Sequence, residues 1–370
     1  MTLARQRRGA ALGLLAAVSF GVSAPLSKLL LAEASPQLLA GLLYLGAGLG
    51  LTLYRVVSPG TREAPLTRAD VPPLLGVIAL GGVAGPLLLM LGLSRVSGAA
   101  GSLLLNLEAP LTILVAAVLF GEHLGRRMAV AAACILLGAV VLRVTPGVVV
   151  IDSLGVAAIA AACLCWAFDN NLTQRLSLRD PFQLVWIKTL AAGTFNTLLA
   201  LVLGAVVPDA GILALALGLG MLSYGVSVVL DAYALRMHGA AREAAYFATA
   251  PFVGAVTAVV LLGDTLGLPE LAAMTLMATG VVFLIRERHA HEHVHEPMEH
   301  AHLHVHDAHD VHDAHDVHDA HDVHDAHDAH HQHDHAPGDP PDEPHAHSHR
   351  HTRLSHNHLH VPDLHHRHHH

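Results

Sequence analysis

The stretch that decides the fold is GAAGSLLLNLEAPLTILVAAVLFGE, residues 98–122, because it returns in the second half of the chain. Its weaker copy is GAAREAAYFATAPFVGAVTAVVLLGD, residues 239–264. Glu108-Ala109-Pro110 corresponds to Thr249-Ala250-Pro251, and the closing Gly-Glu corresponds to Gly-Asp, with one residue inserted between the two anchors. Because both copies are apolar and long enough to span a membrane, the duplication predicts a transporter built from two related helical halves.

The repeat extends to both sides of this stretch. The run GAVVL that begins at Gly138 matches GVVFL at Gly280, a spacing of 142 residues. Phe20-Gly21, with LSK at 26–28, is matched less closely by Trp166-Ala167, with LTQ at 172–174. These matches predict a first five-helix repeat over residues 9–145 and a second over residues 152–286.

The composition of the chain changes near Arg288. Residues 1–288 hold 18 Lys plus Arg and 14 Asp plus Glu, a formal charge of +4. Residues 289–370 hold 3 basic residues, 16 acidic residues and 31 of the 33 histidines, a formal charge of −13 with histidine neutral. The tail has almost no large apolar residues to bury, so the sequence predicts that residues 289–370 form a disordered His/Asp-rich metal-binding tail.

Ten apolar stretches have the length, about 20 residues, that a bilayer core requires of a helix. A soluble bundle would have to bury ten nearly uncharged helices with only 4% aromatic residues, which disfavours it. The sequence predicts an all-α polytopic membrane protein with ten transmembrane helices at 10–31, 36–57, 71–93, 98–120, 126–144, 153–175, 181–206, 210–234, 239–262 and 267–286.

The placement of arginine predicts the orientation of these helices, since short loops rich in Lys and Arg stay in the cytoplasm. With the N-terminus inside, all loop arginines except Arg95 and Arg143 fall on the cytoplasmic side. Five helices per repeat is an odd number, so the second repeat is predicted to be inverted. We expect a bacterial-type inner membrane protein with both termini in the cytoplasm. A cleavable signal peptide ending near Val22-Ser23-Ala24 is the alternative, and Pro25 after the cut disfavours it.

These residues resemble the EamA-type branch of the drug/metabolite transporter superfamily. The resemblance covers nearly all of residues 9–286 and is carried by Glu108-Ala109-Pro110, Phe120-Gly121-Glu122 and Gly138, with weaker counterparts in the second copy. It implies ten helices in two inverted repeats, alternating access and, usually, export of a small solute driven by an ion gradient. The chain departs from symmetry where Thr249 replaces Glu108, so a carboxylate function there is not shared by both repeats.

Polar and helix-bending residues inside the apolar stretches are the candidates for the solute or ion pathway. A charge within the hydrocarbon costs about 2.5–3.5 kcal/mol on insertion scales, so such residues face a partner or a water-filled cavity. Asn196 and Glu243 are of this kind, and the principal candidates are Lys28, Asn106, Glu108, Pro110, Asp169, Asn170, Asn171, Lys188, Asp231 and Pro251.

Two carboxylates carry the hypothesis of coupling or substrate contact, Glu108 and Asp169. Glu108 lies two residues before Pro110, whose ring removes a backbone donor, and it is able to exchange a proton or bind a cation. A structural pair with Lys28 or Lys188 is the alternative. Asp169-Asn170-Asn171 turn through about 300° of a helix, so the three side chains cannot all face one pathway. Glu122 and Asp264 follow glycines and are interpreted mainly as helix caps or loop anchors.

The histidines of the tail predict binding of Ni, Co, Zn or Cu, because neutral imidazole is a ligand for these ions. Part of the tail repeats histidine every three residues, and the flanking segments use His-x-His spacing. We expect such binding to fade below about pH 6, as histidine protonates. The predicted metal positions are His291, His293, His295, His302, His304, His306, His309, His312, His315, His318, His321, His324, His327 and His330.

The sequence therefore predicts an inner-membrane secondary transporter, an exporter of a small solute, with a metal-binding cytoplasmic tail. A transition-metal exporter with the metal as cargo is the first alternative, and a membrane-anchored metal store or chaperone is the second. No catalytic motif is recognised, and the chain is not expected to be an enzyme or to require a cofactor. Its expected partners are the lipid bilayer, the solute or metal ion, and a proton as coupling ion, with no nucleic acid and with a homodimer left open.

Overall fold

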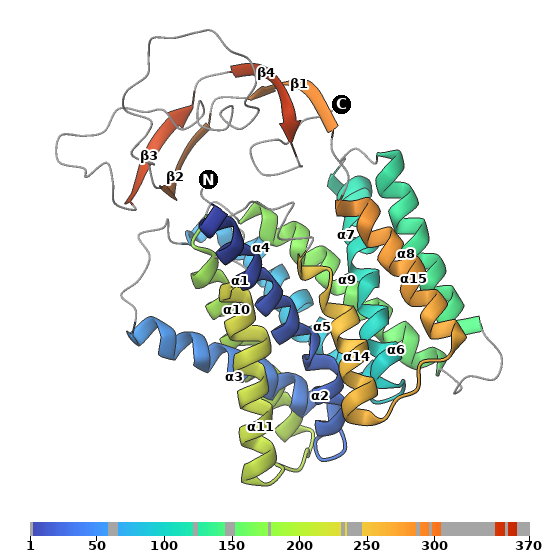
Figure 1. Ribbon diagram of the computed structural model, residues 1–370. Helices are drawn as coiled ribbons and strands as arrows, with labels where there is room; N and C mark the ends of the chain where they lie inside the picture. Colours follow the sequence, from blue (N-terminus) through green and yellow to red (C-terminus); the bar gives the residue numbers. More distant parts are fainter. Residues whose placement is uncertain are drawn as a thin grey trace.

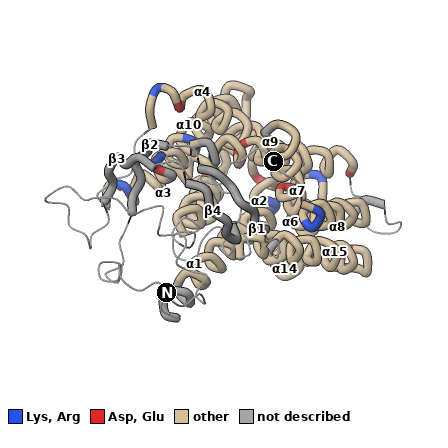
Figure 2. Tube along the Cα trace, turned by 90° about the horizontal axis from the view of Figure 1, so that it is seen from above, with Lys and Arg blue, Asp and Glu red and all other residues tan. Residues whose placement is uncertain are grey.

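The computed structural model describes residues 3–57, 66–120, 125–144, 152–176, 179–230, 234 and 246–285 and, in the tail, four strands. The described part of residues 3–285 is helical, and its helices pack side by side (Figure 1). Seen from above, most described positions of this helical body are uncharged (Figure 2). Such a distribution is the one that a bilayer requires of the proteins that cross it.

The first repeat is built from five helical passages, three of which change helix type along their length or are divided. They are α1 (Leu3–Gly21) with α2 (Ser23–Leu30); α3 (Pro36–Val57); η1 (Arg68–Asp70), α4 (Val71–Gly76), η2 (Val77–Ala84) and α5 (Gly85–Leu93); α6 (Gly98–Leu104), η3 (Leu105–Leu107) and α7 (Glu108–Phe120); and α8 (Arg126–Val144). The segment η2 is a π-helix, whereas η1 and η3 are 3₁₀-helices.

The second repeat follows the same order over its described residues. Its elements are α9 (Ser153–Arg175), α10 (Pro181–Val202), α11 (Ala210–Gly220) with the π-helix η4 (Met221–Val226), α14 (Ala250–Leu262) and α15 (Leu268–Ile285). The third helical passage of each repeat therefore contains one π-helix, η2 in the first and η4 in the second. Single π-turns inside α-helices occur frequently at functional sites.

Seven of the described helices are long and apolar enough to cross a membrane. They are Gly9–Leu30, Pro36–Val57, Arg68–Leu93, Gly98–Leu119, Ser153–Thr173, Phe182–Val202 and Ala210–Leu230. Two shorter apolar helices follow, Ala250–Leu262 and Leu268–Leu284. The prediction of an integral membrane protein with several apolar helices is confirmed, and the number of ten spans stays a prediction.

Aspartate and serine side chains begin several of these helices. Asp180 accepts hydrogen bonds from the backbone N–H groups of Phe182 (2.9 Å) and Gln183 (3.3 Å) at the start of α10. Asp209 accepts in the same way from Gly211 (2.7 Å) and Ile212 (3.2 Å) at the start of α11. These side chains satisfy N–H groups that have no partner within the helix. Asp180 and Asp209 are therefore the N-caps of α10 and α11.

The last helices of the two repeats, α8 and α15, pack against each other through two glycines in reciprocal positions. A Cβ built on Gly138 would lie 2.7 Å from Met277 Cγ and 3.1 Å from the carbonyl oxygen of Ala273. A Cβ built on Gly280 would lie 2.7 Å from both the carbonyl oxygen of Ala131 and Ile135 Cγ1. At the repeat spacing of 142 residues, position 131 corresponds to 273 and position 135 to 277, so the two repeats exchange equivalent contacts.

The second helices of the repeats, α3 and α10, show the same reciprocity. A Cβ on Gly41 of α3 would lie 2.5 Å from Thr197 N, and a Cβ on Gly193 of α10 would lie 2.7 Å from Leu45 Cα. Here both pairs of corresponding positions are 152 residues apart. Small residues let the backbones of membrane helices approach closely, and the glycines of the internal repeat therefore build the interface between the two halves.

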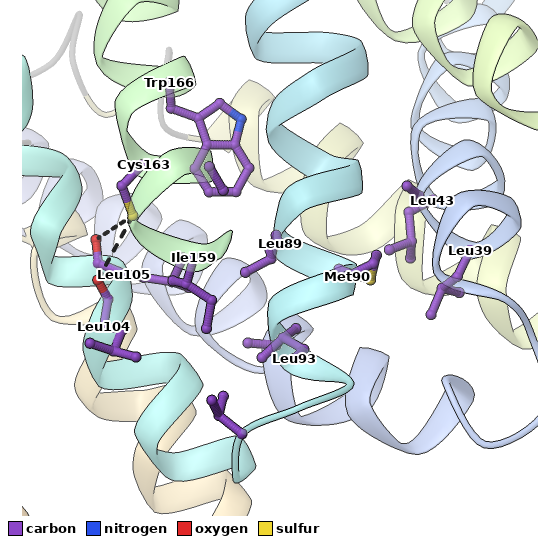
Figure 3. Close-up of a cluster of buried hydrophobic side chains, with 14 of the residues drawn as sticks. Leu39, Leu43, Leu89, Met90, Leu93, Leu104, Leu105, Ile159, Cys163 and Trp166 are labelled. Atoms are coloured by element: carbon purple, nitrogen blue, oxygen red, sulfur yellow. Dashed lines mark hydrogen bonds between the residues drawn. The ribbon is translucent and has the colours of Figure 1, made fainter. Parts of the chain in front are cut away.

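The core between the repeats is formed mainly by leucine and alanine. Figure 3 shows part of it, with Leu89, Met90 and Leu93 of α5 between side chains of α3 and α9. The thiol of Cys163 lies 3.8 Å from the carbonyl oxygen of Leu104 and 3.9 Å from that of Leu105, which are contributed by α6 and η3 (Figure 3). Cys134 and Cys165 are half-buried, and all three cysteines are free.

The tail contains four strands, although the sequence analysis predicts disorder there. They are β1 (His289–His295), β2 (Met298–His304), β3 (His345–His351) and β4 (Leu354–His360). β1 pairs with β4 and β2 pairs with β3, both antiparallel. The physical reason is the His-x-His alternation, which has the two-residue period of a strand. The run with a histidine at every third residue lies outside the described residues.

Candidate functional site

The densest group of polar side chains in the helical body lies where α9 meets α7, α10 and η2. Asp169, Asn170 and Asn171 of α9 contribute to it, together with Glu108 of α7 and Lys188 of α10. All four elements belong to the candidate spans, with α7 in Gly98–Leu119 and η2 in Arg68–Leu93. The structure thus brings together five of the residues that the sequence analysis predicts for the pathway.

Asp169 and Lys188 form an ion pair between α9 and α10. Their side chains are 6% and 15% exposed, so protein covers both charges almost completely. The second carboxylate oxygen of Asp169 lies 3.4 Å from the hydroxyl of Thr173. Burying two charges is costly unless they are paired and hydrogen-bonded, and this pair meets that condition.

The ion pair fits because η2 presents two glycines to it. A Cβ on Gly81 would collide with the carboxylate of Asp169. A Cβ on Gly82 would lie 2.7 Å from Ala192 Cβ and 3.5 Å from Lys188 Cγ. The third helical passage of the first repeat therefore makes room for a buried pair of charges through two successive residues without side chains.

The carbonyl oxygen of Gly81 accepts two side-chain hydrogen bonds. Tyr44 of α3 donates its hydroxyl at 3.0 Å, and Trp166 of α9 donates its indole N–H at 3.1 Å. Tyr44 and Trp166 are both buried. These two donors and Gly81 are parts of the site that sequence reasoning missed. Trp166 stands in the repeat match with Phe20, but nothing in the sequence indicates the π-helix that Gly81 belongs to.

Glu108 makes a different kind of contact. Its Oε1 accepts a hydrogen bond from Asn170 Nδ2 at 2.8 Å, and the same Nδ2 lies 3.5 Å from the hydroxyl of Thr112. Glu108 is half-buried and Asn170 is exposed. Among the described residues no Lys, Arg or His forms an ion pair with Glu108, so neither Lys28 nor Lys188 is its structural partner there.

The three successive polar residues of α9 point to different neighbours, as their helical spacing predicts. Asp169 meets Lys188 on α10, whereas Asn170 meets Glu108 on α7. Asn171 is buried and donates to the carbonyl oxygens of Ala167 (2.8 Å) and Thr112 (3.2 Å). Asn171 therefore holds α9 against α7, while the other two carry the contacts between side chains.

The remaining predicted residues lie elsewhere in the helical body. Lys28 donates to the carbonyl oxygen of Leu93 at 2.6 Å, and Asn106 in η3 donates to the carbonyl oxygen of Leu103 at 3.1 Å. Pro110 lies in the first turn of α7, directly after the 3₁₀ segment, and Pro251 is the second residue of α14. Both prolines thus lie in the first turn of their α-helix, where the missing N–H breaks no hydrogen bond of that helix. Asp231 and Glu243 lie outside the described residues.

Asp264 has the capping role that the sequence analysis predicts. Its Oδ2 accepts a hydrogen bond from the backbone N–H of Ala99 at 2.8 Å, at the start of α6. Gly263, before it, has φ 70° and ends α14 in the left-handed conformation that favours glycine. The Gly-Asp motif of the second repeat therefore fastens the end of α14 to the first repeat. Glu122, its counterpart, lies outside the described residues.

Four aromatic rings form a chain of contacts that begins at Tyr44. Tyr224 of η4 contacts Tyr44 with ring centroids 5.5 Å apart and Phe20 with centroids 5.6 Å apart, and Phe20 in turn lies 5.3 Å from Phe247. Tyr44 also donates to Gly81. The two π-helices, η2 and η4, are therefore joined through Tyr44, one by a hydrogen bond and the other by ring packing.

The predicted metal positions fall in two classes. Five of them lie in strands: His291, His293 and His295 in β1, and His302 and His304 in β2. The other nine lie outside the described residues: His306, His309, His312, His315, His318, His321, His324, His327 and His330. Where the structure describes side chains, it has no group of three or more His, Cys, Asp and Glu residues able to hold a metal ion.

Comparison with known proteins agrees with the two helical halves. The model of the EamA-like transporter family matches twice, over residues 7–144 and 153–286. An uncharacterized transporter of Methanothermobacter thermautotrophicus is 29% identical over 287 residues, which cover 73% of this chain and 83% of that protein. A chain from a crystal structure superposes with a TM-score of 0.55 at 19% identity and covers 74% of this chain and 95% of its own length, a likeness of fold.

The two family matches fall on the two predicted repeats, and together they cover most of the chain. With the transporter relative and the apolar helices, they identify an integral membrane transporter of a small solute. The chain therefore belongs to the EamA-like transporter family.

Proposed function

We propose that this protein is an inner-membrane secondary transporter that exports a small solute in exchange for protons. In this proposal both termini lie in the cytoplasm, and the histidine-rich tail binds a divalent transition metal there. Glu108 carries the coupling proton, and the Asp169–Lys188 pair holds the surrounding helices in position. Asn170 contacts the solute or the protonated Glu108.

The observation that carries the proposal is the environment of Glu108. The residue lies within the candidate span Gly98–Leu119, and it has one hydrogen-bond donor, Asn170, but no ion-pair partner among the described residues. A carboxylate that lacks a fixed counter-ion is able to gain and lose a proton without breaking an ion pair. Since Glu108 and Asn170 are incompletely covered by protein, the cost of charge in hydrocarbon favours their facing a water-filled pathway.

The proposed cycle needs only one proton and one solute. The Glu108 carboxylate accepts a proton from the outer side, and the neutral acid carries no charge to be hydrated while the two repeats change orientation. It then releases the proton to the cytoplasm, and the carboxylate is restored. A solute bound at the same position leaves when the proton arrives, so the proton gradient drives export. Thr249 occupies the corresponding place in the second repeat and cannot exchange a proton in this way.

Asp169 has another role in the proposal. Its charge is already neutralised by Lys188, and its side chain is almost completely covered. An ion pair of this kind between α9 and α10 is suited to fixing the helices that surround Glu108, rather than to carrying a proton in every cycle. Loss of either partner leaves the other charge buried and unpaired.

The tail component of the proposal rests on composition. Residues 289–370 contain 31 histidines and 16 acidic residues, and imidazole suits Zn, Cu and Ni. A cytoplasmic segment of this kind would capture the metal or sense its concentration. Three arrangements follow: a tail that senses metal for an organic solute exporter, a tail that delivers metal as the cargo, and a membrane-anchored store that transports nothing.

The experiment is the measurement of cellular nickel, cobalt, zinc and copper by elemental mass spectrometry at matched sub-toxic loads. Cells lacking the protein are compared with cells making the full chain, residues 1–288 alone, or the full chain with Glu108→Gln. Immunoblots of membranes establish equal amounts. Metal that rises with the tail whether or not Glu108 is intact indicates binding without metal transport, as the proposal expects.

The alternatives give different patterns. If the full chain lowers one metal selectively and Glu108→Gln abolishes the effect, the metal is the cargo, and the proposal of an organic solute is wrong. A store predicts that removing residues 289–370 removes every phenotype of the protein. If the tail changes no metal at any load, the metal component of the proposal fails.

A further inference from the structure

The tail contains a second duplication, separate from that of the helices. HAHEHVHEPMEHAHLH, residues 289–304, returns as HAHSHRHTRLSHNHLH, residues 345–360. Each copy places seven histidines at the same positions of a 16-residue unit. We call residues 289–304 the first histidine unit and residues 345–360 the second histidine unit. The segment between the two units contains the run with a histidine at every third residue.

The strands of the tail follow these units. β1 and β2 are the two halves of the first histidine unit, and β3 and β4 are the two halves of the second. The pairing is antiparallel and nested, because β1 pairs with β4 and β2 with β3. The same register runs through both ladders, which form two separate two-stranded sheets.

The register places histidine opposite histidine. The pattern of histidines in the unit reads almost the same in both directions. An antiparallel pairing of two copies therefore places most histidines of one copy opposite histidines of the other. Six pairs of histidines stand directly opposite each other: His289 and His360, His291 and His358, His293 and His356, His300 and His349, His302 and His347, and His304 and His345. Within each ladder the three pairs occupy alternate positions, and alternate positions of a strand share one face of the sheet.

Directly opposite positions of antiparallel strands suit shared metal ligation. Their Cβ atoms are about 4.5–5.5 Å apart, and successive positions on one face of a strand are separated by about 6.6 Å, twice the rise of 3.3 Å per residue. Zinc binds imidazole nitrogen at about 2.0–2.1 Å and takes four ligands in a tetrahedron. Two successive opposed pairs therefore place four histidine positions, two from each histidine unit, at the spacing that one zinc ion needs.

We propose that the two histidine units form one shared binding site for divalent transition-metal ions, in which each ion takes ligands from both units. This inference rests on the metal component of the proposed function and adds to it that neither unit binds these ions alone. Binding displaces protons from protonated imidazoles and changes no oxidation state. The consequence for the protein is that metal draws together two segments of the tail that are 56 residues apart.

The test is a cycle of variants of the full chain, purified in detergent. The seven histidines of the first unit, of the second unit, or of both are replaced by asparagine, and bound Zn²⁺ is counted by elemental analysis after dialysis near neutral pH. If the units share their ions, either replacement removes the same number of ions as the double replacement, because the losses are not additive. A matched control removes seven histidines between the units, at 306, 309, 312, 315, 318, 321 and 324, and its loss adds to that of either unit.

The other outcomes contradict the inference. Losses that add up between the two units show that each binds zinc alone, which overturns sharing and leaves metal binding by the tail intact. A double replacement without loss shows that the units bind nothing. If the unaltered chain binds no zinc, the metal component of the proposed function fails together with the inference.

Spin labels distinguish the antiparallel pairing from a parallel one. In a background with Cys134, Cys163 and Cys165 replaced by alanine, labels are placed at Glu292 and Asn357, which are register partners. Labels at Glu292 and Ser348 form the control pair, because these positions correspond in the duplication but lie in different sheets, where they are not register partners. With Zn²⁺ the first pair should show dipolar broadening that a chelator removes. Broadening of the control pair, or of neither pair, overturns the inference.

Discussion

The carboxylate of Asp169 in α9 occupies the space beside Gly81 of η2 that a side chain at position 81 would need. The same carboxylate pairs with Lys188 of α10, and the carbonyl oxygen of Gly81 accepts hydrogen bonds from Tyr44 of α3 and Trp166 of α9. A single glycine thus joins helices of both repeats. Because the space is filled by a charged group with a fixed partner, we expect this position to tolerate no larger residue.

The variant Gly81→Ala tests this packing. Its methyl group meets the carboxylate of Asp169, so either the ion pair or the π-helix has to shift, and overpacking of this kind costs about 1–3 kcal/mol. We expect a lower midpoint of thermal unfolding for the protein in detergent. Gly218→Ala is the matched control, since a Cβ at Gly218 meets nothing within 4 Å. Equal midpoints for the two variants contradict the packing.

Because Asp169 and Lys188 form an ion pair, neutralising Asp169 should restore part of the stability that is lost when Lys188 is neutralised. Lys188→Gln leaves the carboxylate of Asp169 buried without its partner, and removing one member of a buried pair costs about 3–5 kcal/mol. Addition of Asp169→Asn removes the unpaired charge, so the double variant should unfold at a higher temperature than Lys188→Gln alone. The measurement is thermal unfolding followed by size-exclusion chromatography. A double variant less stable than Lys188→Gln shows that the two charges do not compensate each other.

Tyr44 and Trp166 both donate to the carbonyl oxygen of Gly81, so the stability lost on replacing one should depend on whether the other is present. Trp166→Phe or Tyr44→Phe removes one hydrogen bond and leaves one donor in place, at an expected cost of about 0.5–1.5 kcal/mol. The double variant leaves the carbonyl without a side-chain donor, so its loss should exceed the sum of the single losses. Thermal unfolding of the four proteins gives this coupling. Strictly additive losses contradict a shared role at Gly81.

Gly138 of α8 and Gly280 of α15 occupy equivalent positions, but we expect alanine to destabilise the protein by different amounts at the two positions. A Cβ on Gly280 lies 2.7 Å from the backbone carbonyl oxygen of Ala131, whereas the nearest atom to a Cβ on Gly138 is Met277 Cγ, also at 2.7 Å. A methionine side chain moves aside more easily than a helix backbone. Gly280→Ala should therefore lower the unfolding midpoint more than Gly138→Ala. The reverse order contradicts the contacts of this interface.

Much of the architecture follows from the sequence because a duplication leaves the same residues in both halves. Gly138 and Gly280 stand out as a repeat match, and the structure places them in reciprocal contacts. Asp180 and Asp209 are recognisable as helix starts, since their short side chains accept from free N–H groups. Asp264 is likewise recognisable as an anchor, and it accepts from Ala99.

The arrangement of the site is predictable only in part. Helical spacing requires that Asp169, Asn170 and Asn171 face different neighbours, but it does not select Lys188 for the first and Glu108 for the second. The role of Gly81 depends on the π-helix η2, which no sequence pattern marks. The strands of the tail were missed because low apolar content suggests disorder, whereas the alternation of histidine has the period of a strand.

The central claim is export of a small solute that depends on the carboxylate of Glu108. Its most direct test compares, by untargeted mass spectrometry, the culture media of cells that make the unaltered protein, Glu108→Gln or Glu33→Gln at equal membrane levels. Glu33 is exposed outside the candidate spans and serves as the control. We predict at least one solute that accumulates outside cells making the unaltered protein or Glu33→Gln but not Glu108→Gln. Media that do not differ between the unaltered protein and Glu108→Gln would contradict the claim.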